Sequence, residues 1–323
     1  MIRRGITAAV AVCALALPAV AQAEVHWQFV ADPAPGATGL DGSVELPPRL
    51  NFTVAAGTPY LAEIGHKPNF ELNVYRPVGN GTWRDLGNGS LNPPGRIAGG
   101  VDLTSVGSTA WIAWEEGATG VPAEVHVARL TRSGVRELPG SPIANAGLPQ
   151  IAYFGGRVYV AYAGIDGMHA VRTRANGRGF ERIESFDHTP AEPGELGVYR
   201  GRLYLSDFES GTTLYSLLNR RATGWVQVDD PPDDLFAQRI GDTTFALAGA
   251  GGEGPGAPSF VRVRATRRGV THEIPSPAKP GNNVSSPHLL AADGTLWMAW
   301  VEGGPSDMAP PQIPHVARLV GGR

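Results

Sequence analysis

The sequence predicts an all-β fold, built as a single domain from six copies of one repeat over residues 24–323. Three observations predict it: the glycine and proline content, a recurring four-residue segment, and a turn glycine ahead of each copy. The chain has 43 Gly and 28 Pro in 323 residues, which is typical of short strands joined by turns. With 42% hydrophobic residues and one cysteine, neither a disordered chain nor a disulfide scaffold fits.

The first 23 residues, 1–23, have the three parts of a secretory signal peptide. They begin with two arginines, continue with an apolar run over 6–17, and end in small residues at 21–23. The apolar run is too short to cross a bilayer. We therefore expect a protein that is secreted to the extracellular space or held in the periplasm, with no membrane span. Because the single cysteine, Cys13, lies in this segment, the mature chain has no thiol chemistry.

Six segments share a lead aromatic residue, an apolar residue, a small residue and a variable fourth-position residue. They are Tyr60-Leu61-Ala62-Glu63, Trp111-Ile112-Ala113-Trp114, Tyr159-Val160-Ala161-Tyr162, Tyr204-Leu205-Ser206-Asp207, Phe245-Ala246-Leu247-Ala248 and Trp297-Met298-Ala299-Trp300. The lead aromatics are 51, 48, 45, 41 and 52 residues apart, close to the roughly 40–50 residues of one propeller blade. The period predicts a six-bladed β-propeller, with five or seven blades as alternatives.

Flanking residues predict four strands in each blade. A turn glycine precedes each lead aromatic, at Gly57, Gly107, Gly156, Gly201, Gly241 and Gly294. A third strand ends in a recurring arginine, at Arg76, Arg129, Arg172, Arg264 and Arg318. A short fourth strand begins at Trp83, Val135, Phe180, Trp225 or Val270. Because the arginine recurs at one structural position, we expect it to pack or to solvate the surface.

The last repeat ends at Arg323 without a fourth strand, and the start of the mature chain supplies one. Trp27, in the segment 25–29, resembles Trp83 and Trp225 at the start of fourth strands. Residues 24–31 are therefore predicted to complete the last blade, which closes the ring and removes its exposed edges. Each lead aromatic shares one strand face with the small residue two places on. We expect these aromatics to form the core between blades.

Counting back nine residues from each lead aromatic is predicted to locate the start of the innermost strand beside the axis. The residues there are Asn51, Asp102, Gln150, Glu195, Phe236 and His288. Most are polar and each is different, which suits a ligand without sixfold symmetry. The fourth-position residues Glu63, Trp114, Tyr162, Asp207 and Trp300, with Glu115 and Glu116, are expected on the same face. Carboxylates with aromatic planes are typical of carbohydrate pockets, although a channel mouth is also polar without any ligand.

Charge distribution and carboxylate clusters bear on the other partners and on cofactors. The basic residues are scattered along the chain, so no nucleic-acid partner is expected. We expect a monomer, no metal site and no cofactor, with one qualification. Clustered carboxylates can hold calcium, and Asp229, Asp230, Asp233 and Asp234 flank a Pro-Pro pair between two blades.

The repeat Trp297-Met298-Ala299-Trp300, followed by His315-Val316-Ala317-Arg318, resembles those of secreted bacterial six-bladed propellers. That group includes sialidase-like and lectin-like members, and the resemblance implies the propeller architecture over nearly all of the mature chain. The nearest match to the sialidase Asp-box, residues 293–297, lacks its leading Ser and its spacing. The arginine triad and the Tyr and Glu pair of sialidases are not found.

Three functions remain open at this point. The favoured one is a non-catalytic binding propeller that recognises a glycan, a cell-wall polymer or an extracellular protein at its axial face. The ligand-binding candidates are Asn51, Asp102, Gln150, Glu195, His288, Trp114, Tyr162 and Trp300. The alternative is a glycoside hydrolase or lyase that uses two of Glu63, Asp102, Glu195 and Asp207 as its carboxylate pair. A purely structural scaffold, with its axis plugged by its own loops, is the third.

Overall fold

The computed structural model describes only part of the chain. The described residues are 25–30, 49–65, 70–78, 81–118, 121–175, 178–183, 192–209, 212–219, 223–232, 235, 237–250, 260–278, 282–303 and 313–321. Within these ranges every regular element is a β-strand, and none of the residues forms a helix that could cross a membrane. The predicted signal peptide, 1–23, lies outside the described residues.

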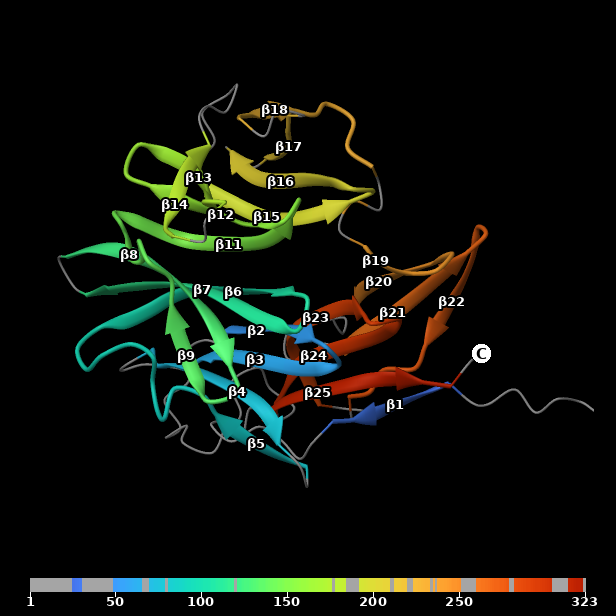
Figure 1. Cartoon of the computed structure of the whole chain (residues 1–323). Helices are drawn as coiled ribbons and strands as arrows, with labels where there is room; N and C mark the ends of the chain where they lie inside the picture. Colours follow the sequence, from blue (N-terminus) through green and yellow to red (C-terminus); the bar gives the residue numbers. More distant parts are fainter. Residues whose placement is uncertain are drawn as a thin grey trace, which may run out of the picture.

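The strands form six sheets arranged around a central axis, which confirms the predicted six-bladed β-propeller (Figure 1). Blade 1 comprises β2 (Arg49–Ala55), β3 (Thr58–Ile64), β4 (Leu72–Val78) and β5 (Thr82–Asp85). Blade 2 comprises β6 (Ile97–Val106), β7 (Thr109–Ala118), β8 (Val121–Thr131) and β9 (Gly134–Glu137), with β10 (Ile143–Ala144) also paired to β8. Blade 3 comprises β11 (Ala146–Phe154), β12 (Arg157–Gly164), β13 (Gly167–Thr173) and β14 (Phe180–Ile183).

The second half of the ring repeats this antiparallel order. Blade 4 comprises β15 (Glu192–Tyr199), β16 (Arg202–Glu209), β17 (Thr212–Leu218) and β18 (Trp225–Gln227). Blade 5 comprises β19 (Gln238–Ile240), β20 (Thr243–Ala250), β21 (Phe260–Arg267) and β22 (Val270–Ile274). Blade 6 comprises β23 (Asn283–Ala292), β24 (Thr295–Gly303), β25 (Ile313–Val320) and, from the other end of the chain, β1 (His26–Phe29).

The N-terminal strand β1 closes the ring, as predicted. It pairs antiparallel with β25, with His26 opposite Val320 and Phe29 opposite Ala317. The indole Nε1 of Trp27 donates a hydrogen bond to the Pro275 carbonyl at 2.8 Å, which ties the strand to the segment after β22 in blade 5. The two ends of the described chain therefore share one sheet.

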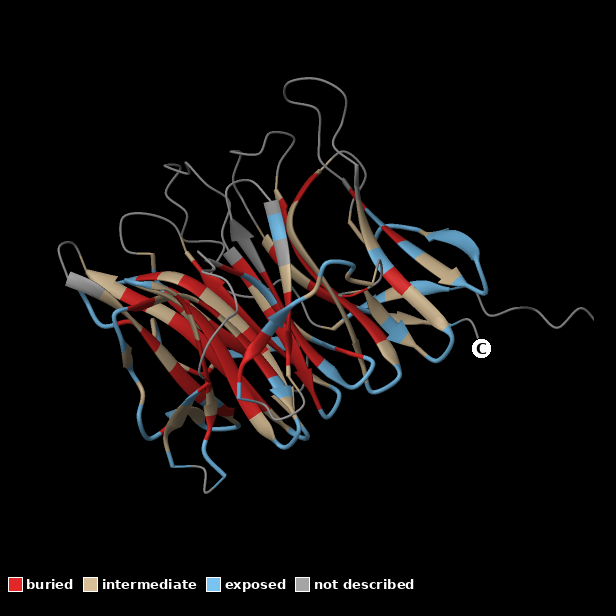
Figure 2. Ribbon diagram, turned by 90° about the horizontal axis from the view of Figure 1, so that it is seen from above, coloured by how far each residue is buried: buried red, intermediate tan, exposed pale blue. Residues whose placement is uncertain are grey.

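Most blades are held by burial of the second strand on both faces; in blade 5, Ala246 of β20 is exposed. In β7, Trp111 and Ala113 pack in one core cluster with blade 3, whereas Ile112 and Trp114 pack in another with blade 1. The same alternation places Trp297 against blade 1 and Met298 against blade 5. Buried residues accordingly occupy the middle of the strands, and the connecting turns are exposed (Figure 2). This confirms that the lead aromatics form the core between blades.

The turn glycines ahead of the lead aromatics are required by backbone conformation. All six have positive φ, from 58° at Gly107 to 83° at Gly156, a region that residues with a Cβ rarely adopt. In blades 1, 3, 4 and 6 the preceding residue also has positive φ; these residues are Ala56, Gly155, Arg200 and Asp293. Two such residues in succession form the hairpin turn whose twist matches that of the flanking strands.

The recurring arginine lies opposite the lead aromatic in the blades where its register holds. Arg129 lies opposite Trp111 and its guanidinium stacks 4.6 Å from the ring centroid. The predicted equivalence of Arg264 was wrong. In blade 5 the residue opposite the lead aromatic Phe245 is Ala265, and Arg264 lies opposite Ala246 instead. A shift of one residue along a strand moves a side chain to the other face.

Deleting residues 24–31 tests the closure. The deletion should lower the melting temperature by roughly 5–10 °C, because the ladder to β25 and the burial of Trp27 together contribute about 3 kcal/mol. Thermal unfolding followed by circular dichroism measures the effect. Val226→Ala, a change at an exposed position of the outer strand β18 in blade 4, is the control. An unchanged melting curve for the deletion would refute the role of β1 in closing the ring.

Candidate functional site

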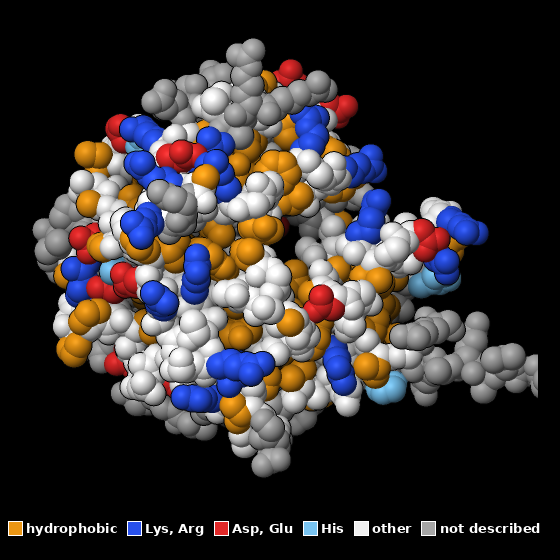
Figure 3. All heavy atoms as spheres, viewed as in Figure 1, with side chains coloured by type: hydrophobic (Ala, Val, Ile, Leu, Met, Phe, Trp, Pro, Cys, Tyr) orange, Lys and Arg blue, Asp and Glu red, His pale blue; other side chains and the backbone are white. Residues whose placement is uncertain are grey.

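A cavity of about 970 Å³ runs along the propeller axis, between the innermost strands of all six blades. The space-filling view shows the molecule hollowed at the centre of the ring (Figure 3). Its lining includes the predicted axial residues that the structure describes, namely Asn51, Asp102, Gln150, Glu195 and His288. We call these five residues the axial ring. The sixth predicted position, Phe236, lies outside the described residues.

Asp102 ties three blades together. Its Oδ1 accepts hydrogen bonds from the Asn51 side chain of blade 1 at 2.9 Å and from its own neighbour, Leu103 N, at 2.8 Å. Its Oδ2 accepts one from Ile151 N of blade 3 at 2.8 Å. Burial nevertheless raises the pKa of Asp102 to about 7, against the opposing effect of these three donors. The carboxyl of Asp102 therefore holds the inner strands in place.

His288 makes the matching contact between blades 6 and 1. It hydrogen bonds to the backbone of Leu50, and burial lowers the pKa of its imidazole. The side chain is therefore neutral at pH 7. A protonated His288 is therefore disfavoured as a counter-charge for the axial carboxylates.

Glu195 and Gln150 are the axial ring residues whose side chains make no hydrogen bond to a neighbouring blade. Among the described residues, neither the Glu195 carboxyl nor the Gln150 amide has a hydrogen-bond partner. Glu195 is exposed to the space inside the channel, but protein surrounds that channel. This enclosure raises the pKa of Glu195 to about 7, and the nearby Asp102 carboxylate raises it further. The two predicted axial carboxyls thus interact across blades 2 and 4.

The nine-residue count predicted that the axial residues lie at the start of the inner strands. The structure places them further along these strands. Strand β6 begins at Ile97, well before Asp102, and β23 begins at Asn283, before His288. A β-bulge interrupts the inner strands of blades 2, 3, 4 and 6 immediately before or at the axial position. Bulges insert an extra residue and re-aim the side chains that follow. The axial ring therefore lies within the channel.

Glu115 holds the bulges of blades 2 and 3 together. Its Oε2 accepts a hydrogen bond from Leu148 N at 2.9 Å. A Cβ added at Gly99 would lie 2.6 Å from the Glu115 Cδ, and one at Gly147 would lie 3.1 Å from it. At position 99, only glycine leaves room for the Glu115 carboxylate. Glu115 therefore has a structural role, and it does not line the axial cavity.

The fourth-position aromatics Trp114, Tyr162 and Trp300 lie away from the cavity, contrary to the predicted placement. They are only 2%, 8% and 0% exposed, and they do not line the cavity. Each pairs across the sheet with a histidine of the third strand. The Trp114 ring stacks on His126 at 4.9 Å, and the Trp300 ring stacks on His315 at 5.2 Å. The histidines were visible in the repeat, three residues before the recurring arginine.

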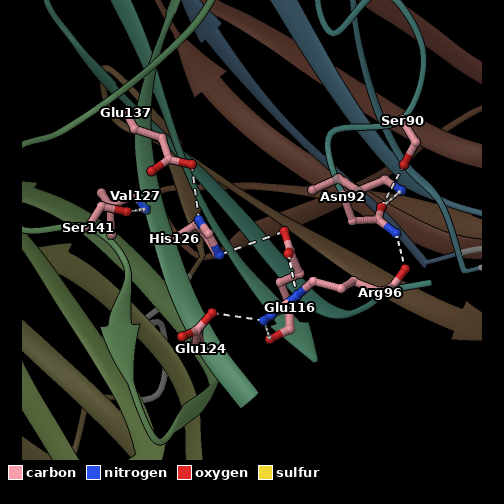
Figure 4. A network of polar contacts seen from close by, with 10 residues as sticks. Ser90, Asn92, Arg96, Glu116, Glu124, His126, Val127, Glu137 and Ser141 are labelled. Atoms are coloured by element: carbon pink, nitrogen blue, oxygen red, sulfur yellow. Dashed lines mark hydrogen bonds and ion pairs between the residues drawn. The ribbon is translucent and has the colours of Figure 1, made fainter. Parts of the chain in front are cut away.

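Polar contacts beside Trp114 complete this packing unit (Figure 4). His126 Nδ1 lies 3.0 Å from Glu137 Oε1, and its Nε2 lies 3.6 Å from Glu116 Oε2. Arg96 lies between carboxylates, with its Nε 2.5 Å from Glu116 Oε1 and a terminal nitrogen 2.8 Å from Glu124 Oε2. Glu116 is thus a buried, paired residue of blade 2.

Glu63, another of the catalytic candidates, does not line the axial cavity. Glu63 is 4% exposed and its Oε2 has no hydrogen-bond partner. Burial raises the pKa of Glu63 to about 7. Asp207 pairs with Pro193 and Leu214 through the backbone of β16, but its side chain lies outside the described part of the structure.

The calcium prediction stays a prediction. Within the described residues no group of three or more His, Cys, Asp or Glu side chains could hold a metal ion. Asp229 and Asp230 are described and exposed, whereas Asp233 and Asp234 lie outside the described residues. The proposed ligand set is therefore incomplete in this structure.

Two kinds of cavity-lining residue escaped the sequence analysis. Tyr153 of β11 lies three residues beyond Gln150 on the same inner strand, lines the cavity and is 38% exposed. Arg239 of β19 and Arg200 at the β15–β16 turn also line it. The signal available for Tyr153 was its place within the inner strand, which the repeat defines by the distance to the next lead aromatic.

Replacing Asp102 should destabilise the fold, whereas replacing Glu195 should not. Asp102→Ala leaves three donors without an acceptor, and we expect a loss of roughly 2–4 kcal/mol in the free energy of unfolding. Glu195→Ala removes no hydrogen bond between blades and is the matched control. Urea denaturation at pH 6 measures both. Equal losses for the two variants would show that Asp102 does not hold the blades together.

Glu63→Gln should change how stability depends on pH. Folding raises the pKa of Glu63 from 4.5 to about 7, so the folded protein binds the proton more tightly than the unfolded chain. The resulting stabilisation is complete below pH 4.5 and is lost as the pH rises to about 7. The stability of Glu63→Gln relative to the parent should therefore rise over this window and then level off. Melting temperatures from pH 4 to pH 8 test this, and a constant difference would contradict it.

Comparisons with known proteins support the fold. No family model and no curated protein sequence matches the chain. Among solved structures, a Dyadobacter fermentans protein of unknown function matches with a TM-score of 0.52 and 14% identity, over 84% of this chain and 93% of that one. A Penicillium chrysogenum α-L-arabinanase complexed with arabinobiose matches with a TM-score of 0.53 and 12% identity, over 92% and 98%. A Trypanosoma rangeli sialidase in complex with the inhibitor DANA matches with a TM-score of 0.54 and 12% identity, over 85% of this chain but only 55% of the sialidase. At these identities the likeness shows a shared propeller fold.

Proposed function

We propose that the protein is a non-catalytic binding propeller that recognises a carbohydrate in its axial cavity, outside the cytoplasm. The observation that carries the proposal is that the axial ring contains two kinds of polar side chain. Asn51, Asp102 and His288 are bonded to neighbouring blades, whereas the polar ends of Gln150 and Glu195 remain available. Fixed polar groups around a few available ones are typical of a preorganised ligand site.

The chemistry of the cavity suits sugar hydroxyl groups. With a pKa of about 7, Glu195 is present both as carboxylate and as carboxylic acid near neutral pH, so it can accept or donate a hydrogen bond. The Gln150 amide does both at any pH. Tyr153 offers a partly exposed aromatic surface on the same wall, against which the C–H face of a sugar can pack. The cavity of about 970 Å³ falls in the usual size range of ligand pockets.

Binding is favoured over hydrolysis because only one axial carboxyl, that of Glu195, is available to a ligand. Glycoside hydrolases ordinarily use two carboxyl groups, one as acid and one as nucleophile or base. Asp102 already accepts three hydrogen bonds from the frame, and Glu63 does not line the cavity. The arabinanase neighbour is complexed with arabinobiose, and the other named neighbour is a sialidase, which supports a saccharide as ligand.

One observation favours the alternative of glycoside hydrolysis. A carboxyl with a pKa raised to about 7, as at Glu195, is suited to serve as a general acid at neutral pH. The interacting carboxyl of Asp102 would then be its partner. A catalytic role would require Asp102 to exchange one of its hydrogen bonds to the inner strands for a contact with water or sugar.

Substitution of the available residues tests the proposal. Residues 24–323 are purified and screened on a glycan array, and the affinity for the strongest ligand is measured by calorimetry. Gln150→Ala and Glu195→Ala should each weaken binding by roughly tenfold or more, because each removes a buried hydrogen bond to the sugar. Gln227→Ala, on the outer strand β18, is the matched control.

Two outcomes would overturn the proposal. Affinity that is unchanged in both axial variants would place the ligand elsewhere. Release of reducing sugar from the bound glycan, abolished by Glu195→Gln, would establish the hydrolase instead.

A further inference from the structure

Blade 4 departs from the repeat at the residue that contacts the backbone of Glu195. The third position of the repeat is Ser206 in blade 4. The same position is alanine in blades 1, 2, 3 and 6, at Ala62, Ala113, Ala161 and Ala299. The Ser206 hydroxyl oxygen accepts a hydrogen bond from Glu195 N at 2.7 Å, and the serine is only 6% exposed. The serine therefore fixes the backbone of the one axial residue that is a glutamate.

A β-bulge sets the direction of the Glu195 side chain. The register shift between β15 and β16 spans Gly194 and Glu195, and a bulge re-aims the side chains that it carries. A Cβ added at Gly194 would lie 2.6 Å from Ser206 Oγ, so a larger residue there would displace the hydroxyl. These contacts all act through the backbone. The carboxyl of Glu195 lines the cavity and has no hydrogen-bond or ion-pair partner among the described residues.

The axial ring contains two carboxyls and no cation. Asp102 accepts hydrogen bonds from three N–H donors, and such donors favour the ionised form of a carboxyl. His288 is neutral because burial lowers the pKa of its imidazole. Asn51 and Gln150 carry no charge. The Asp102 carboxylate therefore acts on Glu195 without a compensating charge from the ring itself.

Two arginines, Arg200 and Arg239, also line the cavity. Arg200 follows β15, and on an extended strand a residue five places beyond Glu195 lies roughly 15 Å from it. An arginine close enough to pair with Glu195 would lower its pKa. The pKa of Glu195 is instead raised, by its enclosure and by the Asp102 carboxylate. Neither arginine therefore offsets the charge on Glu195.

An ammonium group suits the space beside Glu195 better than a hydroxyl group does. Its N–H donors form charge-assisted hydrogen bonds to a carboxylate, which are stronger than hydrogen bonds between neutral groups. Its charge also offsets the repulsion between Glu195 and Asp102. The amide of Gln150 lines the same cavity, and its oxygen can accept a further hydrogen bond. A metal ion is less suitable, because the described residues contain no group of three His, Cys, Asp or Glu side chains that could hold one.

We propose that the ligand of the axial cavity is a saccharide with a free amino group, whose ammonium group binds the Glu195 carboxylate. The inference rests on the proposed function of the axial ring and deepens it by naming the class of sugar. Gln150 contacts the same sugar unit, and the C–H face of that unit packs against Tyr153. An uncharged sugar can also occupy the cavity, but it leaves the two carboxyls in mutual repulsion.

Matched oligosaccharides test the amino group. Glucosamine and galactosamine oligomers are each compared with oligomers of the same length and linkage in which an acetamide or a hydroxyl group replaces the amino group. Calorimetry at pH 6 measures their affinity for the protein of residues 24–323. In at least one series the amino oligomer should bind about tenfold more tightly than both uncharged oligomers, because it gains charge-assisted hydrogen bonds in an enclosed site. Equal affinities throughout both series would overturn the inference.

Proton release tests whether the amino group lies beside Glu195. With a pKa of about 7, Glu195 is mostly protonated at pH 6, whereas an ammonium partner requires the carboxylate. Binding of the preferred amino oligomer should therefore release about one proton to the buffer. Calorimetry in buffers of different ionisation enthalpy measures this release, and Glu195→Gln should abolish it. Equal release in the parent and in the variant would overturn the inference.

Charge-matched variants separate the site from the net charge of the chain. Glu195→Gln should weaken binding of the amino oligomer by about tenfold, because it loses the charge-assisted hydrogen bonds. It should change binding of the uncharged oligomers little, because the glutamine amide still hydrogen bonds to a hydroxyl group. Asp229→Asn removes the same charge from an exposed position after β18 and should affect neither ligand. Equal losses in the two variants would reduce the effect to net charge and overturn the inference.

The axial variant Gln150→Ala separates failure of the inference from failure of the proposed function. If the amino sugar lies in the axial cavity, Gln150→Ala weakens its binding as well. Binding of uncharged and amino oligomers with equal affinity, weakened equally by Gln150→Ala, would leave the proposed function standing while refuting the inference. Binding of any oligomer that depends on neither Gln150 nor Glu195 would refute both.

Discussion

Burial of the second strand between two neighbouring blades is the constraint on which most of this structure depends, with Ala246 of β20 in blade 5 as the exposed exception. A strand between two neighbouring sheets must present apolar side chains in both directions, and β7 does so with Trp111 and Ala113 on one side and Ile112 and Trp114 on the other. The aromatic that spans one junction needs a small residue beside it to leave space for its neighbours. This packing produces the repeat, and the hydrogen bond from Trp27 to Pro275 and the pairing of β1 with β25 complete it.

The axis is organised by a different constraint, the satisfaction of buried polar groups. Inner strands converge there, and a carboxyl such as that of Asp102 can be placed among them because three N–H donors surround it. Residues that hold the blades and residues that face the cavity therefore occupy the same ring. Asp102 and Glu195 both have a pKa raised to about 7, but burial among backbone donors makes the first structural, whereas exposure inside the channel leaves the second available.

The packing constraint is relaxed in blade 5. Blade 5 has a short inner strand, β19, and a third strand shifted by one residue, so that Arg264 occupies a face that is core elsewhere.

The sequence by itself determined the all-β class, the six blades, the closing strand at Trp27 and the axial residues from Asn51 to His288, because these follow from one period and its positions. Only the tertiary structure decided what those positions do. Bulges in four inner strands moved the axial ring into the channel, and the alternation of strand faces buried Trp114, Tyr162 and Trp300 against histidines rather than exposing them. A period fixes the order of residues along the chain, but a bulge or a one-residue register shift, as at Arg264, changes the face on which a side chain lies. The shift at Arg264 is visible only when β21 is paired with β20.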